Sequence, residues 1–543
     1  MKYSFLVLLL LLFISAYGQV INEEKIVKVN SPSLTSAFNI VYDSKNDDYA
    51  YLILADTITY MSRIISNKGN SEIYGDIAIS NILFDDDGNY FAIAGNDTYT
   101  DNSKYFFIKN GKELDKFQKI TGQLTRHNKT LYFIGRKNNR ESLYKYDIQS
   151  GKLSHEKEYD HIKIPFTQIN MTDDYNAVIP FNSKGEIYYI AGNESGEMFV
   201  IGKSESQPFA QIDQYTVKED AKGNIAYIAS DVPDSYDGKY LIYKNEVYSS
   251  EGSMGYVYDF DYTTGLPVYY TSELQKDSTY YDTYWRGKEK METFEGQISE
   301  LKVAPDGKII LIVSYYKSPD SSYSYVVIDG KKSEKLYAAY NIEFSKQNDV
   351  FYIAAPDTSN YFVMKNFTKI SDSYSNVSYM KLLPDGRLFY AAFPYSPYEE
   401  FSGKCYIFIN EKKFGIFNLY FYDYDYDPFL VTTNEFGDFA FTINENSVPA
   451  DETDISTSII TNSWTAKDVG FVSDLNYFKR DLYYSSWLTS RSDNDGYYRV
   501  FRNKTAITDK YDSLSDYKFN KEKKEISFIG LKKDVYYYVT IKL

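Results

Sequence analysis

Acidic residues that alternate with tyrosine are the side chains in this sequence best placed for ion chemistry. In the run YFYDYDYDPF (420–429), an extended strand would place three carboxylates on one face, those of Asp423, Asp425 and Asp427. The run YVYDFDY (256–262) repeats the pattern with Asp259 and Asp261. Ca²⁺ prefers carboxylate oxygens, so one hypothesis is a cation site. The alternative, which we favour, is an acidic face turned to water above a buried aromatic one.

Two of the three histidines stand close together in the sequence SHEKEYDHIKI, which contains His155, Asp160 and His161. Zinc sites use such side chains, but in spacings such as HExxH, and the sequence contains no such spacing. We therefore interpret these two histidines as solvated loop residues; the third histidine is His127. The segment DNDG (493–496) contains part of a calcium-loop pattern, lacks the later glutamate, and is typical of a hairpin turn.

Patterns that mark common catalytic centres are missing from the sequence. It contains neither the G-x-S-x-G elbow of serine hydrolases nor a glycine-rich phosphate loop. Most aspartates fall in recurring turns, where a carboxylate caps backbone amides. We therefore predict no catalytic, cofactor-binding or metal-binding residue and no cofactor. The alternative is a glycosidase or lyase whose paired carboxylates gather at one mouth of a channel.

Composition indicates a large, acidic, strand-rich chain. Its 543 residues carry a formal net charge of −16 and include 59 tyrosines. Tyrosine favours half-buried pleated surfaces, and the negative charge repels nucleic acid. The single cysteine, Cys405, lies in the alternating run CYIFIN, which predicts a small residue in a strand core and excludes an intramolecular disulfide.

The first 18 residues, MKYSFLVLLLLLFISAYG, have the features of a signal peptide. A basic residue precedes a short apolar core, and small residues precede Gln19, where we expect cleavage. The alternative is an uncleaved N-terminal anchor. Because no later segment is long and apolar enough to cross a bilayer, we expect a secreted, periplasmic or cell-surface protein without a membrane span after cleavage.

A turn rich in Asp, Asn and Gly recurs along the chain and is followed each time by alternating aromatic and aliphatic residues. Five copies are clear: FDDDGNYFAIAG (84–95), FNSKGEIYYIAG (181–192), EDAKGNIAYIAS (219–230), VAPDGKIILIVS (303–314) and LLPDGRLFYAAF (382–393). Seven weaker copies begin at residues 43, 125, 261, 344, 433, 477 and 519. Gly223, Gly265 and Gly307 lie 42 residues apart in succession, which gives the period of the repeat.

A second element lies between these copies and reads as strand, short turn, strand. Examples are YFFIKNGKELDKF (105–117) and YVVIDGKKSEKL (325–336), whose Asn-Gly and Asp-Gly pairs suit two-residue hairpins. Each unit thus holds four short strands, which is the blade of a β-propeller. A β-helix would use shorter rungs, and immunoglobulin-like sandwiches would repeat at more than twice this length.

The P-D-G-[KR] turns at 305–308 and 384–387, each followed by an apolar strand, resemble the WD40-like repeats of TolB-type propellers, whose usual form is F-S-P-D-G-K. Phe344 and Ser345 keep the start of that form without its P-D-G. The resemblance covers most of the chain as a repeat, although only two copies carry the turn intact. It implies an all-β propeller, and such proteins mostly act as binding or scaffolding modules, sometimes attached to catalytic domains.

About twelve blades exceed the usual ring of four to eight, which predicts two tandem propellers. Six blades in each place the boundary near residue 295, with a signal peptide at 1–18, one propeller at 19–295 and a second at 296–543. Seven plus five is the alternative. The segment EKIVKV (24–29) and the last strand, DVYYYVTIKL (534–543), are expected to pair in one closing blade.

The function we predict is that of an exported, non-catalytic propeller that binds a protein or a glycan. Propellers bind at the channel mouth or across one face, where the connections between strands gather. The longer connections, near 155–175 and 445–470, are therefore the expected binding loops, and the many tyrosines could supply stacking surfaces.

Overall fold

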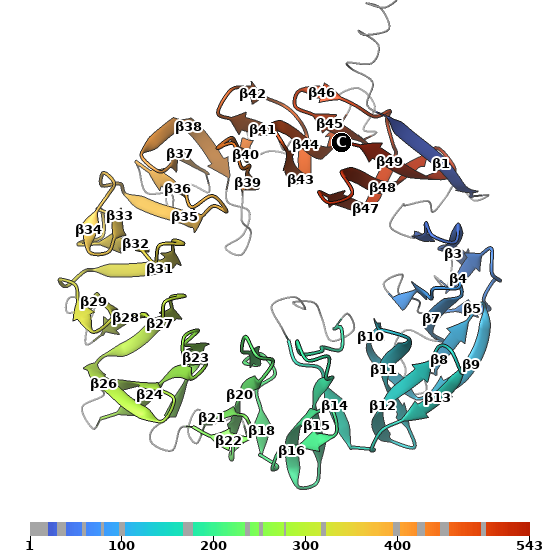
Figure 1. The fold of residues 1–543 in the computed structure, drawn as a ribbon, viewed down its shortest axis with the longest axis horizontal. Coiled ribbons are helices and arrows are strands. Elements are labelled where there is room, and N and C mark those ends of the chain that lie inside the picture. The colour runs from blue at the N-terminus through green and yellow to red at the C-terminus, as the bar shows by residue number, and fades with distance from the viewer. Residues whose placement is uncertain are drawn as a thin grey trace, which may run out of the picture.

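The computed structural model describes fifteen stretches of the chain and is all-β. These are residues 20–29, 40–56, 61–75, 77, 81–96, 104–166, 177–233, 239–248, 253–275, 279–316, 322–394, 402–420, 429–445, 456–489 and 496–543. They form 49 strands in twelve antiparallel sheets that stand side by side around a ring (Figure 1). Within these stretches, no helix is long and apolar enough to cross a membrane.

The blades are numbered in chain order, and within most of them the strands follow the order of the sequence. Blade 1 contains β2 (Ile40–Asp43), β3 (Asp48–Asp56), β4 (Met61–Ser66) and β5 (Ile73–Tyr74). Blade 2 contains β6 (Leu83–Phe84), β7 (Tyr90–Gly95), β8 (Tyr105–Lys109) and β9 (Lys112–Phe117). Blade 3 contains β10 (Lys119–His127), β11 (Thr130–Lys137), β12 (Arg140–Asp147) and β13 (Lys152–His155). Blade 4 contains β14 (His161–Lys163), β15 (Tyr188–Asn193), β16 (Gly196–Ile201) and β17 (Ser204–Glu205).

Blade 5 has five strands, because its first strand is broken into two pieces. It contains β18 (Gln211–Ile212), β19 (Lys218–Glu219), β20 (Ile225–Ser230), β21 (Lys239–Tyr243) and β22 (Glu246–Val247). Blade 6 contains β23 (Ser253–Phe260), β24 (Pro267–Leu274), β25 (Tyr280–Arg286) and β26 (Glu289–Glu295). Blade 7 contains β27 (Gln297–Val303), β28 (Ile309–Tyr315), β29 (Tyr323–Ile328) and β30 (Lys331–Lys332). Blade 8 contains β31 (Ala338–Phe344), β32 (Val350–Ala355), β33 (Phe362–Lys365) and β34 (Thr368–Lys369).

The last four blades complete the ring, and the final one is discontinuous in sequence. Blade 9 contains β35 (Asn376–Leu382), β36 (Leu388–Phe393), β37 (Ser402–Ile409) and β38 (Lys412–Tyr420). Blade 10 contains β39 (Val431–Thr433), β40 (Phe439–Glu445), β41 (Ser456–Thr461) and β42 (Thr465–Ala466). Blade 11 contains β43 (Phe471–Phe478), β44 (Asp481–Thr489), β45 (Gly496–Arg502) and β46 (Thr505–Ala506). Blade 12 contains β47 (Ser513–Asn520), β48 (Glu525–Lys532), β49 (Val535–Lys542) and the N-terminal β1 (Ile21–Lys28).

Each of the twelve sequence repeats proves to be the turn into a blade's second strand, so the predicted propeller is confirmed. In blade 5, the carboxylate of Asp220 accepts hydrogen bonds from the backbone N–H groups of Lys222 and Asn224, both at 2.8 Å. Gly223 supplies the left-handed backbone that closes this turn, with φ of 77°. The Asp-Gly composition of the repeat is therefore a requirement of turn geometry.

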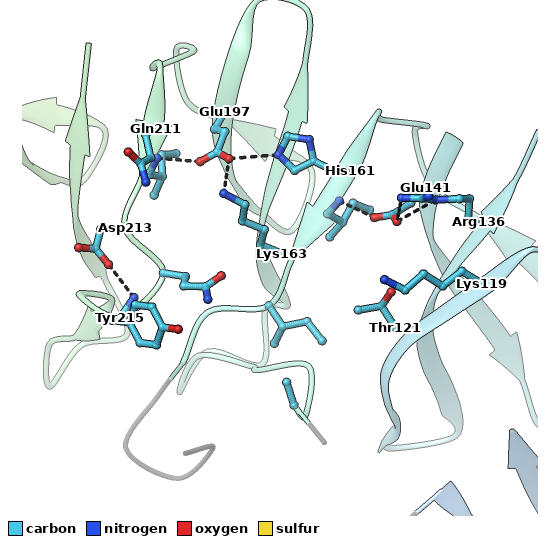
Figure 2. Close-up of a pocket in the computed structure, with 15 residues that line it drawn as sticks. Lys119, Thr121, Arg136, Glu141, His161, Lys163, Glu197, Gln211, Asp213 and Tyr215 are labelled. Atoms are coloured by element: carbon cyan, nitrogen blue, oxygen red, sulfur yellow. Dashed lines mark hydrogen bonds and ion pairs between the residues drawn. The ribbon is translucent and has the colours of Figure 1, made fainter. Parts of the chain in front are cut away.

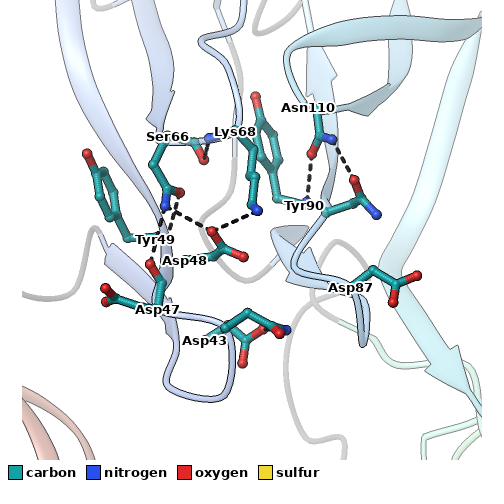
Figure 3. A network of polar contacts seen from close by, with 12 residues as sticks. Asp43, Asp47, Asp48, Tyr49, Ser66, Lys68, Asp87, Tyr90 and Asn110 are labelled. Carbon is teal, nitrogen blue, oxygen red and sulfur yellow. Dashed lines mark hydrogen bonds and ion pairs between the residues drawn. The ribbon is translucent and has the colours of Figure 1, made fainter.

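The second sequence element is the turn between the third and fourth strands, and the side chain of its asparagine binds the backbone of the second strand. Asn110, at φ of 49°, accepts a hydrogen bond from the Tyr90 N–H at 2.9 Å, so that the turn also caps the start of the second strand (Figure 3). The same side-chain bond recurs in blades 8, 9 and 11, where the asparagines are Asn366, Asn410 and Asn503.

The predicted closing blade is confirmed: β1 pairs antiparallel with β49, from Ile21 opposite Ile541 to Lys28 opposite Val535. Blade 12 then packs on blade 1, where Val29 and Leu531 share a buried cluster with Tyr51. Two tandem six-bladed rings would instead have joined blade 1 to blade 6. The structure thus arranges the twelve blades in one ring (Figure 1), whereas the sequence led us to expect two.

Blades 6 and 7, on either side of residue 295, pack together like other neighbours. Phe294 of blade 6 is buried with Ile298 and Leu311 of blade 7. Whether 19–295 and 296–543 are separate folding units stays a prediction. Buried clusters of this kind lie between successive blades, and the fully buried Cys405 belongs to the one between blades 9 and 10, as its alternating sequence predicts.

Candidate functional site

A pocket of about 780 Å³ opens between blades 3, 4 and 5 (Figure 2). Its lining side chains come from the first strands of the three blades and from the hairpins beside them. The ionisable ones are Lys119, Arg136, Glu141, His161, Lys163, Glu197 and Asp213. The pocket therefore gathers ionisable groups beside the apolar clusters that hold blades 3, 4 and 5 together.

The pocket lies on the face of the ring where the longer connections emerge. Lys119 and His161 begin first strands, and Glu141 and Glu197 lie near the start of third strands. On this face second strands join third strands: β40 ends at Glu445, for example, and β41 begins only at Ser456. Most turns on the opposite face are short hairpins. Connections of variable length commonly carry binding functions, so this face is the better candidate for recognition.

Two carboxylates in the pocket join neighbouring blades in the same way. Glu141 of blade 3 accepts a hydrogen bond from the Ile162 N–H of blade 4 at 2.7 Å. Glu197 of blade 4 accepts one from the Ile212 N–H of blade 5 at 2.8 Å. Paired backbone hydrogen bonds lie beside each carboxylate, between Glu141 and Tyr159 and between Glu197 and Phe209. These acids therefore act first as inter-blade contacts.

The second oxygen of each carboxylate is bound by cations that line the pocket. Arg136 reaches Glu141 Oε1 with its Nε at 3.0 Å and its Nη2 at 2.6 Å. Glu197 Oε1 accepts from Lys163 and contacts His161 Nε2 at 3.1 Å. Burial of Glu197 opposes its ionisation, but the bonds from His161, Lys163 and the Ile212 N–H outweigh burial and lower its pKa to about 2. Glu197 is thus ionised at neutral pH.

Lys119 differs from the other cations of the pocket, because within the described stretches its ammonium has no hydrogen-bond or ion-pair partner. Figure 2 shows its side chain pointing into the space from blade 3. Tyr215 of blade 5 points into the same space from the opposite side. The pocket therefore has an available cation at one end and an aromatic ring at the other.

The ring of Tyr215 is held in place although it is exposed. It is 71% exposed and stacks on Phe166, with centroids 4.8 Å apart and planes 5° from parallel. The Phe166 N–H donates to the Gln214 carbonyl at 3.0 Å, and the Tyr215 N–H donates to Asp213 Oδ1 at the same distance. Both backbone segments are thereby fixed, so the stacked pair is a prepared surface rather than two independent side chains.

Other exposed aromatic side chains occur on the same face. Besides Tyr215, the structure exposes Tyr280, Tyr281, Tyr316, Tyr337 and Phe471 near the ends of strands there. A second pocket, of about 360 Å³, lies between blades 8 and 9 and is lined by Tyr337, Tyr340 and Tyr361. It contains no charged side chain among its lining residues, so it offers less chemistry than the pocket of blades 3 to 5.

On the opposite face of blades 1 and 2, the aspartates of the turns make contacts within and between the two blades. Asp48 is buried, and its Oδ1 accepts from Asn67 Nδ2 at 2.9 Å and pairs with Lys68 Nζ at 3.1 Å (Figure 3). Its Oδ2 lies against Gly88 of the next blade, at 1.7 Å from the position that a Cβ would occupy. These turns thus join two blades, and no group of three or more metal-ligating side chains gathers in the described part of the chain.

Only some of the acidic residues singled out in the sequence lie in the described part of the structure. Asp423, Asp425 and Asp427 lie outside the described residues, as do residues 493–495 of the DNDG turn. Asp259 accepts a hydrogen bond from the Val303 N–H of blade 7 at 3.1 Å, and buried Asp261 caps its own turn at Thr263. These two carboxylates therefore serve backbone contacts rather than the water-facing acidic surface that the sequence led us to expect.

The three histidines do not form one cluster. His155 Nδ1 lies 2.9 Å from the Glu156 carbonyl, His161 contacts Glu197, and His127 stacks on Phe181 at 4.2 Å. His161 thus joins the first and third strands of blade 4 and lines the pocket, which its interpretation as a solvated loop residue missed. Sequence reasoning also missed Lys119, Glu141, Glu197 and Tyr215. An acid followed by three buried residues at the start of third strands would have indicated the two glutamates.

Comparison with protein-family models and with curated proteins gives no match. Among solved structures, the chain is similar to a eukaryotic initiation factor, with 11% identity over 74% of this chain and 96% of that chain and a TM-score of 0.31. It is also similar to TolB from Acinetobacter baumannii, with 16% identity over 54% of this chain and 77% of that chain and a TM-score of 0.24. A third similar structure is the β-propeller domain of the Trilobed protease from Pyrococcus furiosus, with 11% identity over 64% of this chain and 94% of that chain and a TM-score of 0.22. These likenesses concern the fold alone.

Proposed function

We propose that this protein is an exported, non-catalytic binding module whose ligand, a protein or a glycan, occupies the pocket between blades 3, 4 and 5. The observation that carries the proposal is that the Lys119 ammonium, which has no partner among the described residues, and the fixed ring of Tyr215 lie on opposite sides of one pocket (Figure 2). Ligand pockets typically combine a few oriented polar groups with an aromatic wall. The face of the pocket, where the longer connections emerge, supports the same function.

The protonation states of the carboxyl groups favour binding over glycoside hydrolysis. A glycosidase needs one carboxyl that stays protonated near neutral pH beside a second that is ionised. Glu197 is ionised, and both glutamates of the pocket are occupied by backbone and cationic donors. Within the described stretches, the carboxyls whose pKa burial raises are Asp282, Glu343 and Asp474, on blades 6, 8 and 11, and none of them lines this pocket.

Export is proposed from the sequence of residues 1–18 and their expected cleavage before Gln19. The test is N-terminal sequencing of the protein recovered from the culture medium or cell envelope. A chain that begins at Gln19 supports export with cleavage. Recovery of the intact chain from the cytoplasm contradicts it.

Retention of partners tests the binding function. The protein beginning at Gln19 is immobilised beside the double variant Lys119→Met/Tyr215→Ala and beside Tyr316→Ala, a control that removes an equally exposed tyrosine, also 71% exposed, elsewhere on the same face. Proteins and glycans of the host envelope are passed over all three. Retention by the wild type and the control but not by the double variant supports the pocket as the site. Equal retention by all three, or release of shortened glycans, overturns the proposal.

A further inference from the structure

Hydrogen-bond donors exceed acceptors at the blade 3 end of the pocket of blades 3 to 5, whereas the third carboxylate of the pocket, Asp213, lies beside Tyr215 at the other end. Both oxygens of Glu141 and both of Glu197 already accept hydrogen bonds from this chain. Donors remain there: within the described residues, the Lys119 ammonium has no partner, and Arg136 uses only Nε and Nη2. A ligand that brings acceptors, above all an anionic group, would satisfy these donors, whereas another donor would find few acceptors on the two glutamates.

The net charge of the chain restricts what kind of anion can enter. With a formal charge of −16, the protein repels a densely charged polyanion at long range. A ligand with a single carboxylate among neutral groups avoids most of this repulsion and still pairs with Lys119. This consideration disfavours polyphosphates and nucleic acids.

The exposed ring of Tyr215 indicates which chemical group of the ligand lies next to its carboxylate. Tyr215 presents a flat, rigid ring in a pocket that is also lined by uncharged polar side chains, among them Thr121 beside Lys119 and Gln214 next to Tyr215 in the sequence. A pyranose ring has an apolar face that can stack on such a ring, while its hydroxyl groups exchange hydrogen bonds with polar neighbours. An aspartate or glutamate side chain of a peptide could pair with Lys119, but it lacks a ring face to cover Tyr215.

We propose that the pocket binds a saccharide with an isolated uronic acid, whose carboxylate pairs with Lys119 near Arg136 and whose sugar ring stacks on Tyr215. The proposal rests on the binding function proposed above and names its ligand class. Loss of one charge-assisted hydrogen bond costs roughly 1.5–3 kcal/mol, so Lys119→Met should weaken binding about tenfold to a hundredfold. Tyr215→Ala removes the stacking surface and should weaken binding about tenfold.

Titration calorimetry with two defined probes tests the ligand class. The probes are a hyaluronan trisaccharide, with one glucuronate between two N-acetylglucosamines, and a glucuronoxylan hexasaccharide with one glucuronate side group. Each is used beside its carboxyl-reduced form, in which the uronic acid has become the neutral hexose. Expected results are binding of at least one acidic probe, a tenfold or greater loss on carboxyl reduction, and the losses given above in the two variants. Tyr316→Ala and Lys523→Met, an exposed lysine of the turn 521–524, serve as matched controls and should bind like the wild type.

A measurement on the wild type guards against variants that fail to fold. Acylation of lysines, followed by mass spectrometry, should show Lys119 protected by the acidic probe and Lys523 unprotected. Equal reactivity of Lys119 with and without a bound probe overturns the assignment of the site.

The outcomes separate this inference from the function on which it rests. If neither acidic probe binds, or the reduced form binds equally well, the uronic acid is wrong; retention of another glycan or protein through Lys119 and Tyr215 would leave the binding module standing. If no ligand depends on these two residues, both proposals fail. Shortening of a probe during the titration would identify an enzyme instead.

Discussion

Asp282 lies buried at the junction of blades 6 and 7, and replacing it by asparagine tests how the ring tolerates a charge that lacks a cation. Its Oδ2 accepts from the Ile298 N–H of blade 7, and its Oδ1 accepts from the Ser272 hydroxyl, both at 2.6 Å. Glu141 and Glu197 make the same contact to the next blade, but cations neutralise them. Within the described residues, the hydrogen-bond partners of the buried Asp282 carboxylate are therefore neutral, and no cation offsets the free energy of burying its charge.

The size of this cost follows from the pKa of Asp282. Burial raises it to about 6 from 3.8, only partly offset by the bonds from Ser272 and Ile298. Below about pH 4 the carboxyl is neutral both folded and unfolded, so no penalty exists. As pH rises between the two values, the unfolded chain gains its charge first, and above about pH 6 the fold is destabilised by about 3 kcal/mol.

Asp282→Asn should therefore raise the free energy of unfolding by up to about 3 kcal/mol at neutral pH and change it little near pH 4. The asparagine oxygen can still accept from Ile298, and its amide can donate to Ser272, so both contacts persist. Urea denaturation at the two pH values, followed by tyrosine fluorescence, measures the difference.

Glu197→Gln is the matched control, because the pKa of Glu197 is lowered to about 2 from 4.5. Its ionised form stabilises the fold above about pH 4.5, and this stability is lost as pH falls through about 2. The variant should be about 3 kcal/mol less stable at neutral pH, opposite in sign to Asp282→Asn. Stability changes of the same sign in the two variants, or a gain in Asp282→Asn that does not depend on pH, would refute the reasoning.

Three further predictions concern the ring. Gly88→Ala should lower the free energy of unfolding, measured in urea, by about 2–5 kcal/mol, because the new Cβ would meet Asp48. Gly386→Ala, at a similar φ but with open space around it, should lower it by only about 1–2 kcal/mol. Equal losses in the two variants would show that Asp48 does not clash with the Cβ. Deletion of β1 should lower the melting temperature in calorimetry and produce dimers in light scattering, because the edge of β49 is exposed; an unchanged monomer would show that β1 does not close the ring. Residues 19–295 expressed alone should fail to give a compact monomer in size-exclusion chromatography, because blades 1 and 6 lose neighbours; a stable monomer would favour two separate propellers.

The blades could be predicted from the sequence because their signals are local. The turn at Asp220 and the asparagine at Asn110 each determine a hairpin within a few residues, and their repetition counts the blades. The number of rings depends on the angle between neighbouring blades, which is the sum of many packing contacts and leaves no motif. The closing pair of terminal strands was predicted, but the cluster in which Tyr51 of blade 1 is buried with Leu531 of blade 12 could not be inferred from spacing.

The candidate site escaped prediction because its residues are distant in sequence and individually ordinary. Lys119, Lys163 and Tyr215 belong to three blades, and only the ring brings them to one space. The predicted connection near 155–175 does adjoin the pocket, because His161 lies within it, but the connection alone names no chemistry. Among the acids that were conspicuous for their alternation with aromatic residues, Asp259 and Asp261 lie in the described part of the chain, and both bind backbone N–H groups.

The pocket lies where the repeat departs from its regular form. In blades 7, 8 and 9 the first strand has seven residues, and its charged side chains bind the backbone of the next blade: Glu300 accepts from the Ile342 N–H at 3.1 Å, and Lys302 donates to the Ile342 carbonyl at 2.5 Å. In blades 4 and 5 the first strand is cut to three residues in β14 and two in β18. Lys119, which begins β10 opposite Arg136, has no partner among the described residues and lies beside these two short strands. The pocket that we propose as the binding site therefore coincides with an irregularity of the repeat, which composition alone does not mark.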